Sequence, residues 1–281
     1  MKPNGNLVSA EWLLEHLNDP SLVILEASMK RPLPGKTNEV GEESIPHARH
    51  FDFETNICDL DSHLPCMMPT AAYFQEKVRA LGVNQDSVVV VYDNMEVYSA
   101  PRAWWMLKSM GCESVYVLNG GLPAWKAIHG PVSRLSEETA TLGNFASRPQ
   151  ANKMLGLAEI KANLDTQEAL VLDARSAARF SGEEPDPRPN VKSGHIPKAK
   201  NLPFSVLQKD GHLLPAQDLK ARFIKLGVAS DDKLIFSCGS GVTACILALA
   251  ASESGYNNIA VYDGSWSEWG TNEAHPVETG H

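Results

Sequence analysis

The sequence is poor in cysteine, and its cysteines are not paired. The 281 residues contain only five, which are Cys58, Cys66, Cys112, Cys238 and Cys245. This odd and widely spaced set, with no C-x-x-C pair, is neither a disulfide framework nor a zinc site. We therefore expect a reduced, cytoplasmic protein in which a single thiol can carry the chemistry.

The sequence also lacks an excess of positive charge and any long apolar run. It has 25 Lys and Arg against 34 Asp and Glu, for a net charge of −9. Without a basic cluster, neither nucleic acid nor an anionic membrane is expected as a partner. No apolar run approaches the roughly 18–20 residues that span a bilayer, and we expect no secretory signal at the start. A hydrophobic content of 43% instead predicts a globular protein.

The chain contains one unit written twice. Val117–Trp125 is echoed by Val261–Trp269, an offset of 261 − 117 = 144 residues. Two copies at this spacing indicate tandem domains, because a solenoid needs several repeats of about 20–50 residues. The polar stretch 133–153 lacks apolar periodicity and is expected to be the linker. The predicted domains are therefore residues 1–132 and 154–281.

Both halves alternate short apolar runs with stretches of helical spacing. Strands are expected at Leu22–Glu26, Ser87–Tyr92, Ser114–Leu118, Ala169–Asp173, Lys233–Ser237 and Ile259–Tyr262. Helices are expected at Ala71–Leu81 (capped by Thr70), Pro101–Met110, Ala216–Leu226 (ending at Gly227) and Val242–Ser254 (ending at Gly255). This alternation predicts two small α/β domains, each a parallel sheet flanked by helices. In such sheets the chemistry lies beyond the carboxyl ends of the strands.

One strand-to-helix loop has the composition of an anion-binding site. It reads Cys238-Gly239-Ser240-Gly241-Val242-Thr243 and lies between the strand ending at Ser237 and the following helix. Two glycines let the backbone curl so that consecutive N–H groups point at one spot, which also faces the start of a helix. The alternative is a buried cysteine in an ordinary turn. The glycine-rich helix start favours Cys238 as a nucleophile.

Cysteine phosphatases and arsenate reductases use a similar loop, but they need an arginine six residues after the cysteine. Ala244 occupies that position here. A phosphate dianion would therefore lack its planar, bidentate partner, and phosphatase activity is not expected.

Several motifs together resemble the rhodanese family of sulfurtransferases. The loop Cys238–Ala244 (CGSGVTA) and the segment Tyr262–Trp269 (YDGSWSEW) carry the resemblance, and Ser193–Pro197 (SGHIP) matches the family's first signature. Tyr98–Trp105 is similar to the matching part of the first half. The likeness spans Ser9–Val277 and is strongest to members that take sulfur from 3-mercaptopyruvate. It implies two tandem rhodanese-like domains and no metal or organic cofactor.

The resemblance also implies a reaction. Cys238 would take the sulfur of 3-mercaptopyruvate as a persulfide, release pyruvate, and pass the sulfur to cyanide or a thiol. That thiol would be a small molecule or a thioredoxin-like protein. Ser240 is the second catalytic residue implied, and the substrate-binding loop residues are Gly239, Gly241, Val242 and Thr243. In the first half the matching position is Asp93, which cannot accept sulfur, so the N-terminal domain is expected to be catalytically silent.

Arg179 and Arg188 match arginines that hold the carboxylate and keto oxygen of the sulfur donor in the resembled enzymes. Guanidinium forks suit a planar 2-oxo acid. The alternative is that both form surface ion pairs with the acidic residues between them.

One part of the family's pattern is altered. A carboxylate and a histidine proposed to act with Ser240 match Glu54 and Cys66. Because Cys66 cannot replace an imidazole, the relay is dispensable or is completed by His63 or a water. Glu54 and Cys66 are therefore not among the predicted catalytic residues. His195 is expected to bind backbone groups and not to act as a base.

Two other functions stay open from sequence. The first is a thiosulfate sulfurtransferase with the same fold and persulfide, although that enzyme has basic residues after its cysteine where Gly239 and Ser240 are neutral. The second is a non-catalytic rhodanese-like binding module, against which the intact Cys238 and both arginines argue.

Overall fold

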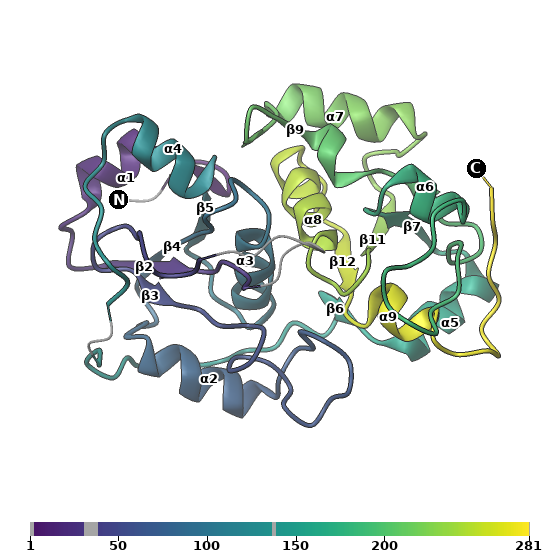
Figure 1. The fold of residues 1–281 in the computed structure, drawn as a ribbon, viewed down its shortest axis with the longest axis horizontal. Helices are drawn as coiled ribbons and strands as arrows, with labels where there is room; N and C mark the ends of the chain where they lie inside the picture. The colour runs from purple at the N-terminus through teal and green to yellow at the C-terminus, as the bar shows by residue number, and fades with distance from the viewer. Residues whose placement is uncertain (1–2, 31–38, 137–138, 281) are drawn as a thin grey trace. The chain divides into compact units, whose positions relative to one another are not determined.

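The computed structural model of the chain describes residues 3–30, 39–136 and 139–280 (Figure 1). The chain divides into two compact units that follow the two halves of the sequence, apart from two short segments. The first unit contains residues 1–61, 68–150 and 210–213, and the second contains residues 62–67, 151–209 and 214–281. Within the described ranges, no helix combines the length and the apolar character needed to cross a bilayer.

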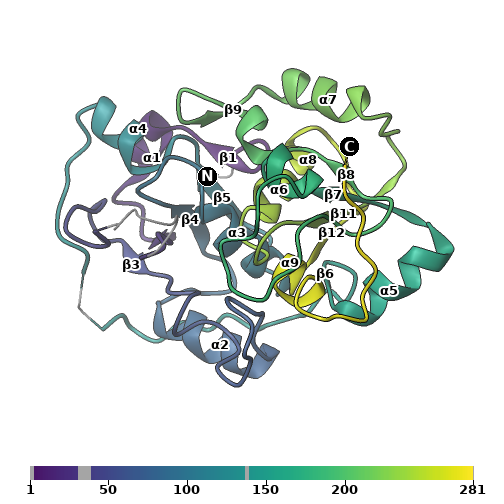
Figure 2. The same cartoon turned by 45° about the vertical axis from the view of Figure 1, so that its right-hand side comes forward.

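Each unit is built on a five-stranded parallel sheet. In the first unit the order is β1-β5-β4-β2-β3, and in the second it is β6-β12-β11-β7-β8. Figure 2 labels the second sheet in this order. The two orders agree strand for strand once the second copy is aligned with the first. This confirms the predicted pair of α/β domains with parallel sheets.

The long strands lie inside their sheets, and all of them were predicted from sequence. They are β2 (Leu22–Glu26), β4 (Val88–Tyr92), β5 (Val115–Leu118), β7 (Ala169–Asp173), β11 (Lys233–Ser237) and β12 (Ile259–Tyr262). Every residue of β4 is buried, and β4 pairs with β2 on one side and β5 on the other. A central parallel strand covered on both faces reads as an unbroken apolar run, which is why the sequence reveals it.

The remaining strands have two residues each and were not predicted. They are β1 (Leu7–Val8), β3 (Arg49–His50), β6 (Met154–Leu155), β8 (Lys200–Asn201), β9 (Gln208–Lys209) and β10 (His212–Leu213). Two residues are too few to show a period of any kind. The edges of both sheets were therefore invisible to the sequence analysis.

The four ten-residue helices expected from apolar spacing are present, with ends that shift by at most two residues. They are α2 (Ala71–Ala80), α3 (Ala100–Ser109), α7 (Ala216–Lys225) and α8 (Ala244–Glu253). Thr70 caps α2 by accepting a hydrogen bond from the Tyr73 N–H (3.3 Å). Gly227 and Gly255 follow α7 and α8 with φ of +79° and +87°, the left-handed conformation that glycine adopts at least cost.

Other helices were not predicted. They are α1 (Ala10–His16), α4 (Gly121–Ala127), α5 (Leu157–Thr166), α6 (Ala177–Ser181), the 3₁₀ helix η1 (Phe204–Leu207) and α9 (Ser265–Trp269). All but α5 have seven residues or fewer, so their periodic signal is weak, and tertiary packing decides whether they form.

The segment predicted as the linker, residues 133–153, forms no helix or strand in its described part, apart from one isolated bridge at Ser133. Main-chain hydrogen bonds tie it to the first unit, from Gly143 N–H to Arg79 O (2.9 Å) and from Arg148 N–H to Met110 O (2.8 Å). The division between the units falls after Gln150, inside this segment.

The loop after β4 in the first unit folds around a carboxylate. Asp93 is completely buried, and its side chain accepts hydrogen bonds from four main-chain N–H groups at 2.8–2.9 Å. The four donors belong to Met95, Tyr98, Ser99 and Ala100. The curled loop is therefore a cradle for an anion, which the protein itself supplies at this site.

We expect Asp93→Ala to destabilise the first unit by at least about 3 kcal/mol, because several main-chain donors lose a charged acceptor. Urea denaturation measures the loss. Asp86→Ala, which removes an exposed acid just before β4, is the matched control and should leave the midpoint unchanged. Equal midpoints for both variants would contradict the cradle.

Candidate active site

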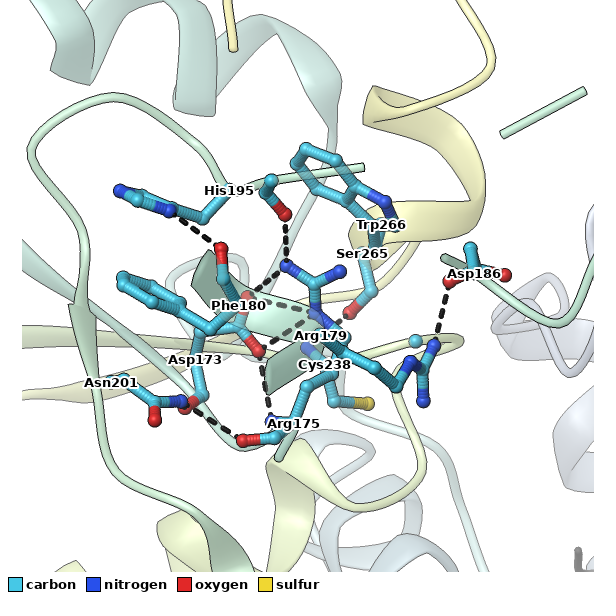
Figure 3. A network of polar contacts seen from close by, with 12 residues as sticks. Asp173, Arg175, Arg179, Phe180, Asp186, His195, Asn201, Cys238, Ser265 and Trp266 are labelled. Carbon is cyan, nitrogen blue, oxygen red and sulfur yellow. Dashed lines mark hydrogen bonds and ion pairs between the residues drawn. The ribbon is translucent and has the colours of Figure 1, made fainter. Parts of the chain in front are cut away.

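Cys238 occupies the position after β11 that Asp93 occupies after β4. Its side chain is buried, with 1% of the residue exposed. Its main-chain N–H donates to the Ser265 hydroxyl oxygen (3.2 Å), and its carbonyl accepts from the Trp266 N–H (3.0 Å). Figure 3 shows Cys238 beside Ser265 and Trp266. Two consecutive residues at the start of α9 thus fix both main-chain groups of the cysteine.

Hydrogen bonds also hold the next carbonyl groups of the loop on the outer side of its curl. They are Gly239 O with the Ser267 N–H (2.8 Å) and Arg188 Nη1 (2.8 Å), and Gly241 O with Cys245 Sγ (3.2 Å). In a trans peptide, a carbonyl and the following N–H point in opposite directions. We expect the N–H groups of Gly239, Ser240 and Val242, which follow these carbonyls, to point away from the groups that bind the carbonyls.

The conformation of the loop explains one of its two glycines. Gly241 has a φ of +75°, which an L side chain rarely adopts. At Gly239, a Cβ would lie 3.4 Å from Arg188 Nη2 and 3.6 Å from Arg179 Nη2, which is ordinary van der Waals contact. Both guanidinium groups thus lie against the loop directly after the cysteine.

Asp186 holds the two arginines together. One of its oxygens accepts from Arg188 Nε (2.8 Å), and the other accepts from Arg179 Nη2 (2.6 Å) and Arg188 Nη2 (3.0 Å). Burial alone would raise the pKa of Asp186, but the hydrogen bonds from Arg188 and Arg179 outweigh it and lower this pKa to about 2. The carboxylate is therefore ionised at neutral pH. The Arg179–Asp186 contact is drawn in Figure 3.

The second unit thus brings the predicted residues to one place. Cys238, the loop residues 239–243, Arg179 and Arg188 all meet at the carboxyl end of β11. Val242 is buried, whereas Ser240 and Thr243 are half-buried. Arg179 Nε is buried without a hydrogen-bond partner among the described residues. The arrangement offers a thiol, a set of main-chain N–H groups and two guanidinium forks.

Two groups of polar residues near the site make structural contacts. His195 Nδ1 is 2.8 Å from Phe180 O, and its ring stacks on the Phe180 ring at 3.7 Å between centroids. Arg175 and Asp173 form a buried ion pair (2.7 Å), which anchors the start of the segment leading to Arg179. Figure 3 shows both groups. These contacts agree with a histidine that binds backbone groups.

The residues of the altered relay fall in different units. Glu54 belongs to the first unit, where its carboxylate accepts from the Lys30 N–H (2.8 Å) and burial raises its pKa. His63 and Cys66 belong to the segment 62–67 that groups with the second unit. His63 is exposed and Cys66 is buried. In the described part of the chain, no three His, Cys, Asp or Glu side chains are grouped as a metal ion would require.

The sequence analysis missed Ser265 and Asp186. A signal for Ser265 exists in the internal repeat, since Ser265 aligns with Gly121 and both have positive φ, +49° and +57°. A residue other than glycine is strained in this conformation, so a serine at position 265 indicates that its hydroxyl group makes a specific contact. Asp186 gave no such signal, because it lies among other acidic residues.

Comparison with other proteins agrees with this geometry. The rhodanese-like domain profile matches residues 9–128 and 157–272. The chain therefore belongs to the rhodanese family, as the sequence predicted.

Individual relatives extend over nearly the whole chain. The 3-mercaptopyruvate sulfurtransferase of Escherichia coli strain K12 is 40% identical over 277 residues, which cover 96% of this chain and 97% of that protein. Thiosulfate/3-mercaptopyruvate sulfurtransferase 1, mitochondrial, of Arabidopsis thaliana is 38% identical over 297 residues, covering 97% and 78%. The crystal structure of SseA from Escherichia coli, described as a 3-mercaptopyruvate sulfotransferase, superposes with a TM-score of 0.83 at 37% identity, covering 94% and 99%.

We expect Ser265→Ala to lower the free energy of unfolding of the second unit by about 1–3 kcal/mol, because the buried N–H of Cys238 loses its acceptor. Sulfur transfer should also slow, since the cysteine main chain is no longer fixed. Ser267→Ala is the control, because that hydroxyl bonds Gly264 O (2.7 Å) and leaves the Cys238 main chain alone. A Ser265→Ala enzyme as stable and active as the control variant would refute this role.

Proposed function

We propose that this protein is a sulfurtransferase that moves sulfane sulfur from 3-mercaptopyruvate to a thiol or cyanide acceptor through a persulfide on Cys238, releasing pyruvate. The observation that carries the proposal is the loop after β11, where the buried Cys238 is followed by a glycine-rich segment that lies against both arginines. The names of the relatives from Escherichia coli and Arabidopsis thaliana support the choice of sulfur donor.

The chemistry follows from the position of the thiol. The Cys238 thiolate attacks the sulfur of 3-mercaptopyruvate, an S–S bond forms, and the C–S bond breaks. The bonding electrons leave with the carbon fragment as the enolate of pyruvate, which takes a proton from solvent. The main-chain N–H groups of the loop stabilise the terminal sulfur of the persulfide as an anion. An acceptor thiolate then attacks that sulfur and restores Cys238.

The arginines would hold the sulfur donor by its other end. Arg179 and Arg188 are 23% and 31% exposed at their side chains, so ligands can reach them. They would bind the carboxylate and keto oxygen, and each charge-assisted hydrogen bond contributes about 1.5–3 kcal/mol. Ser240, Thr243 and the N–H groups of the loop would complete the site around the sulfur.

Thiosulfate is the second candidate sulfur donor, since the Arabidopsis thaliana relative is named for both compounds. It is a small dianion, and Gly239 and Ser240 next to Cys238 supply no formal positive charge. This favours 3-mercaptopyruvate. A small thiol or a thioredoxin-like protein would be the acceptor.

We also assign the protein to the cytoplasm, because its five cysteines are all buried and none forms a disulfide.

Replacing the nucleophile tests the proposal directly. Cys238→Ser should abolish sulfur transfer from either sulfur donor and leave the fold intact, because a serine hydroxyl cannot form a persulfide. Mass spectrometry of the wild-type protein, after the sulfur donor is added without an acceptor, should find one extra sulfur on the peptide that contains Cys238. Extra sulfur on Cys66 or Cys245 instead would refute the assignment.

Removing the arginines tests the binding of the sulfur donor. Arg179→Ala and Arg188→Ala should each lower kcat/KM for 3-mercaptopyruvate by roughly ten- to a hundred-fold, a loss of about 1.4–2.7 kcal/mol of transition-state stabilisation. Arg222→Ala, on an exposed position of α7, should behave as the wild type. If all three variants match the wild type, the sulfur donor binds elsewhere.

A further inference from the structure

The carboxylate of Asp186 lies between the two arginines assigned to the sulfur donor. Its side chain is 1% exposed, and it contacts a guanidinium group of each arginine at 2.6–3.0 Å. The main-chain N–H of Arg188 also donates to the Asp186 carboxylate (3.1 Å). Asp186 therefore fixes both forks and removes one of their two positive charges.

The formal charge of this cluster is 2 − 1 = +1, since Arg179 and Arg188 each contribute one positive charge and Asp186 one negative. The neighbouring acidic side chains of Glu183 and Glu184 are exposed, so water and salt screen them. Arg175 adds no net charge, because Asp173 neutralises it in a buried pair. Among the acidic groups that the structure describes, the carboxylate of Asp186 is the one that forms ion pairs with both guanidinium groups.

A cluster of charge +1 balances one carboxylate, which is what 3-mercaptopyruvate presents. Thiosulfate brings two negative charges on a smaller body and must approach the same thiolate. The Nη2 atoms of both arginines lie beside Gly239, one residue from the nucleophile. The negative charge of Asp186 is therefore in contact with the same guanidinium groups that lie against the residue after Cys238.

We propose that Asp186 is a specificity-determining residue: by cancelling one positive charge of the arginine pair, it selects a monoanionic 2-oxo acid as the sulfur donor and disfavours the thiosulfate dianion. This inference rests on the proposed sulfurtransferase function. It assigns part of the choice of sulfur donor to a buried charge outside the cysteine loop, in addition to the neutral residues Gly239 and Ser240.

The test compares steady-state kcat/KM for 3-mercaptopyruvate and thiosulfate, with cyanide as the acceptor, in the wild type and in charge variants. Asp186→Asn should raise the thiosulfate-to-mercaptopyruvate ratio by at least about ten-fold, with a gain for thiosulfate itself. That gain should shrink as salt is added. Asp186→Glu keeps the charge and should stay within about three-fold of the wild-type ratio. Asp186→Ser is a second neutral variant that should shift the ratio as the asparagine does.

Glu184→Gln is the matched control, because it removes the same charge from the same segment at an exposed position. It should leave the ratio unchanged. A ratio that does not move in either neutral variant overturns the inference, as does an equal loss with both sulfur donors, which would mean that Asp186 only orients the arginines. An equal shift in Glu184→Gln also overturns it. A wild type inactive with 3-mercaptopyruvate but active with thiosulfate would instead overturn the proposed function as well.

Discussion

The site depends on one constraint, which is that the carbonyl groups of the loop after β11 are bound on the outer side of its curl. Trp266 and Ser267 of α9 bind the carbonyls of Cys238 and Gly239, and Cys245 of α8 binds that of Gly241. Peptide geometry points the following N–H groups away from those partners, and such fixed dipoles would stabilise an anion next to the thiol in the proposed reaction. The helix α8, buried from Ala244 to Ala251, supports the loop from behind.

The internal repeat shows which parts of this design serve the fold and which serve the chemistry. Both units share one main-chain hydrogen bond to the first residue of the loop. The Leu122 N–H donates to Asp93 O (2.9 Å) in the first unit, and the Trp266 N–H donates to Cys238 O (3.0 Å) in the second. The first unit fills its cradle with its own carboxylate, so no external anion is needed or admitted. The second unit has the thiol of Cys238 at the matching position. In the proposed function, this sulfur receives a second sulfur atom inside the same kind of loop.

In the proposed function, the charge that binds the sulfur donor comes from outside the loop, because the loop itself carries no formal charge. Positive charge comes from Arg179 and Arg188, on a segment that Asp173 and Arg175 anchor to the end of β7. Asp186 orients both forks and sets their net charge, while Arg188 connects them to the loop through Gly239 O. A short polar segment thus places both guanidinium groups beside the loop that carries Cys238.

The sequence by itself determined the α/β class and the long strands and helices, and it predicted Cys238 as the nucleophile. These depend on local patterns such as the buried run of β11 and the glycines after it. The sequence also predicted, through resemblance, that Arg179 and Arg188 bind the sulfur donor, and this stays a prediction. Only the tertiary structure revealed Ser265 and the bond from Arg188 to Gly239, which join residues 27 and 51 positions apart. It likewise distinguished Asp186 from its acidic neighbours. Such contacts depend on how β7, β11 and α9 meet in space, and no local pattern of residues encodes that meeting.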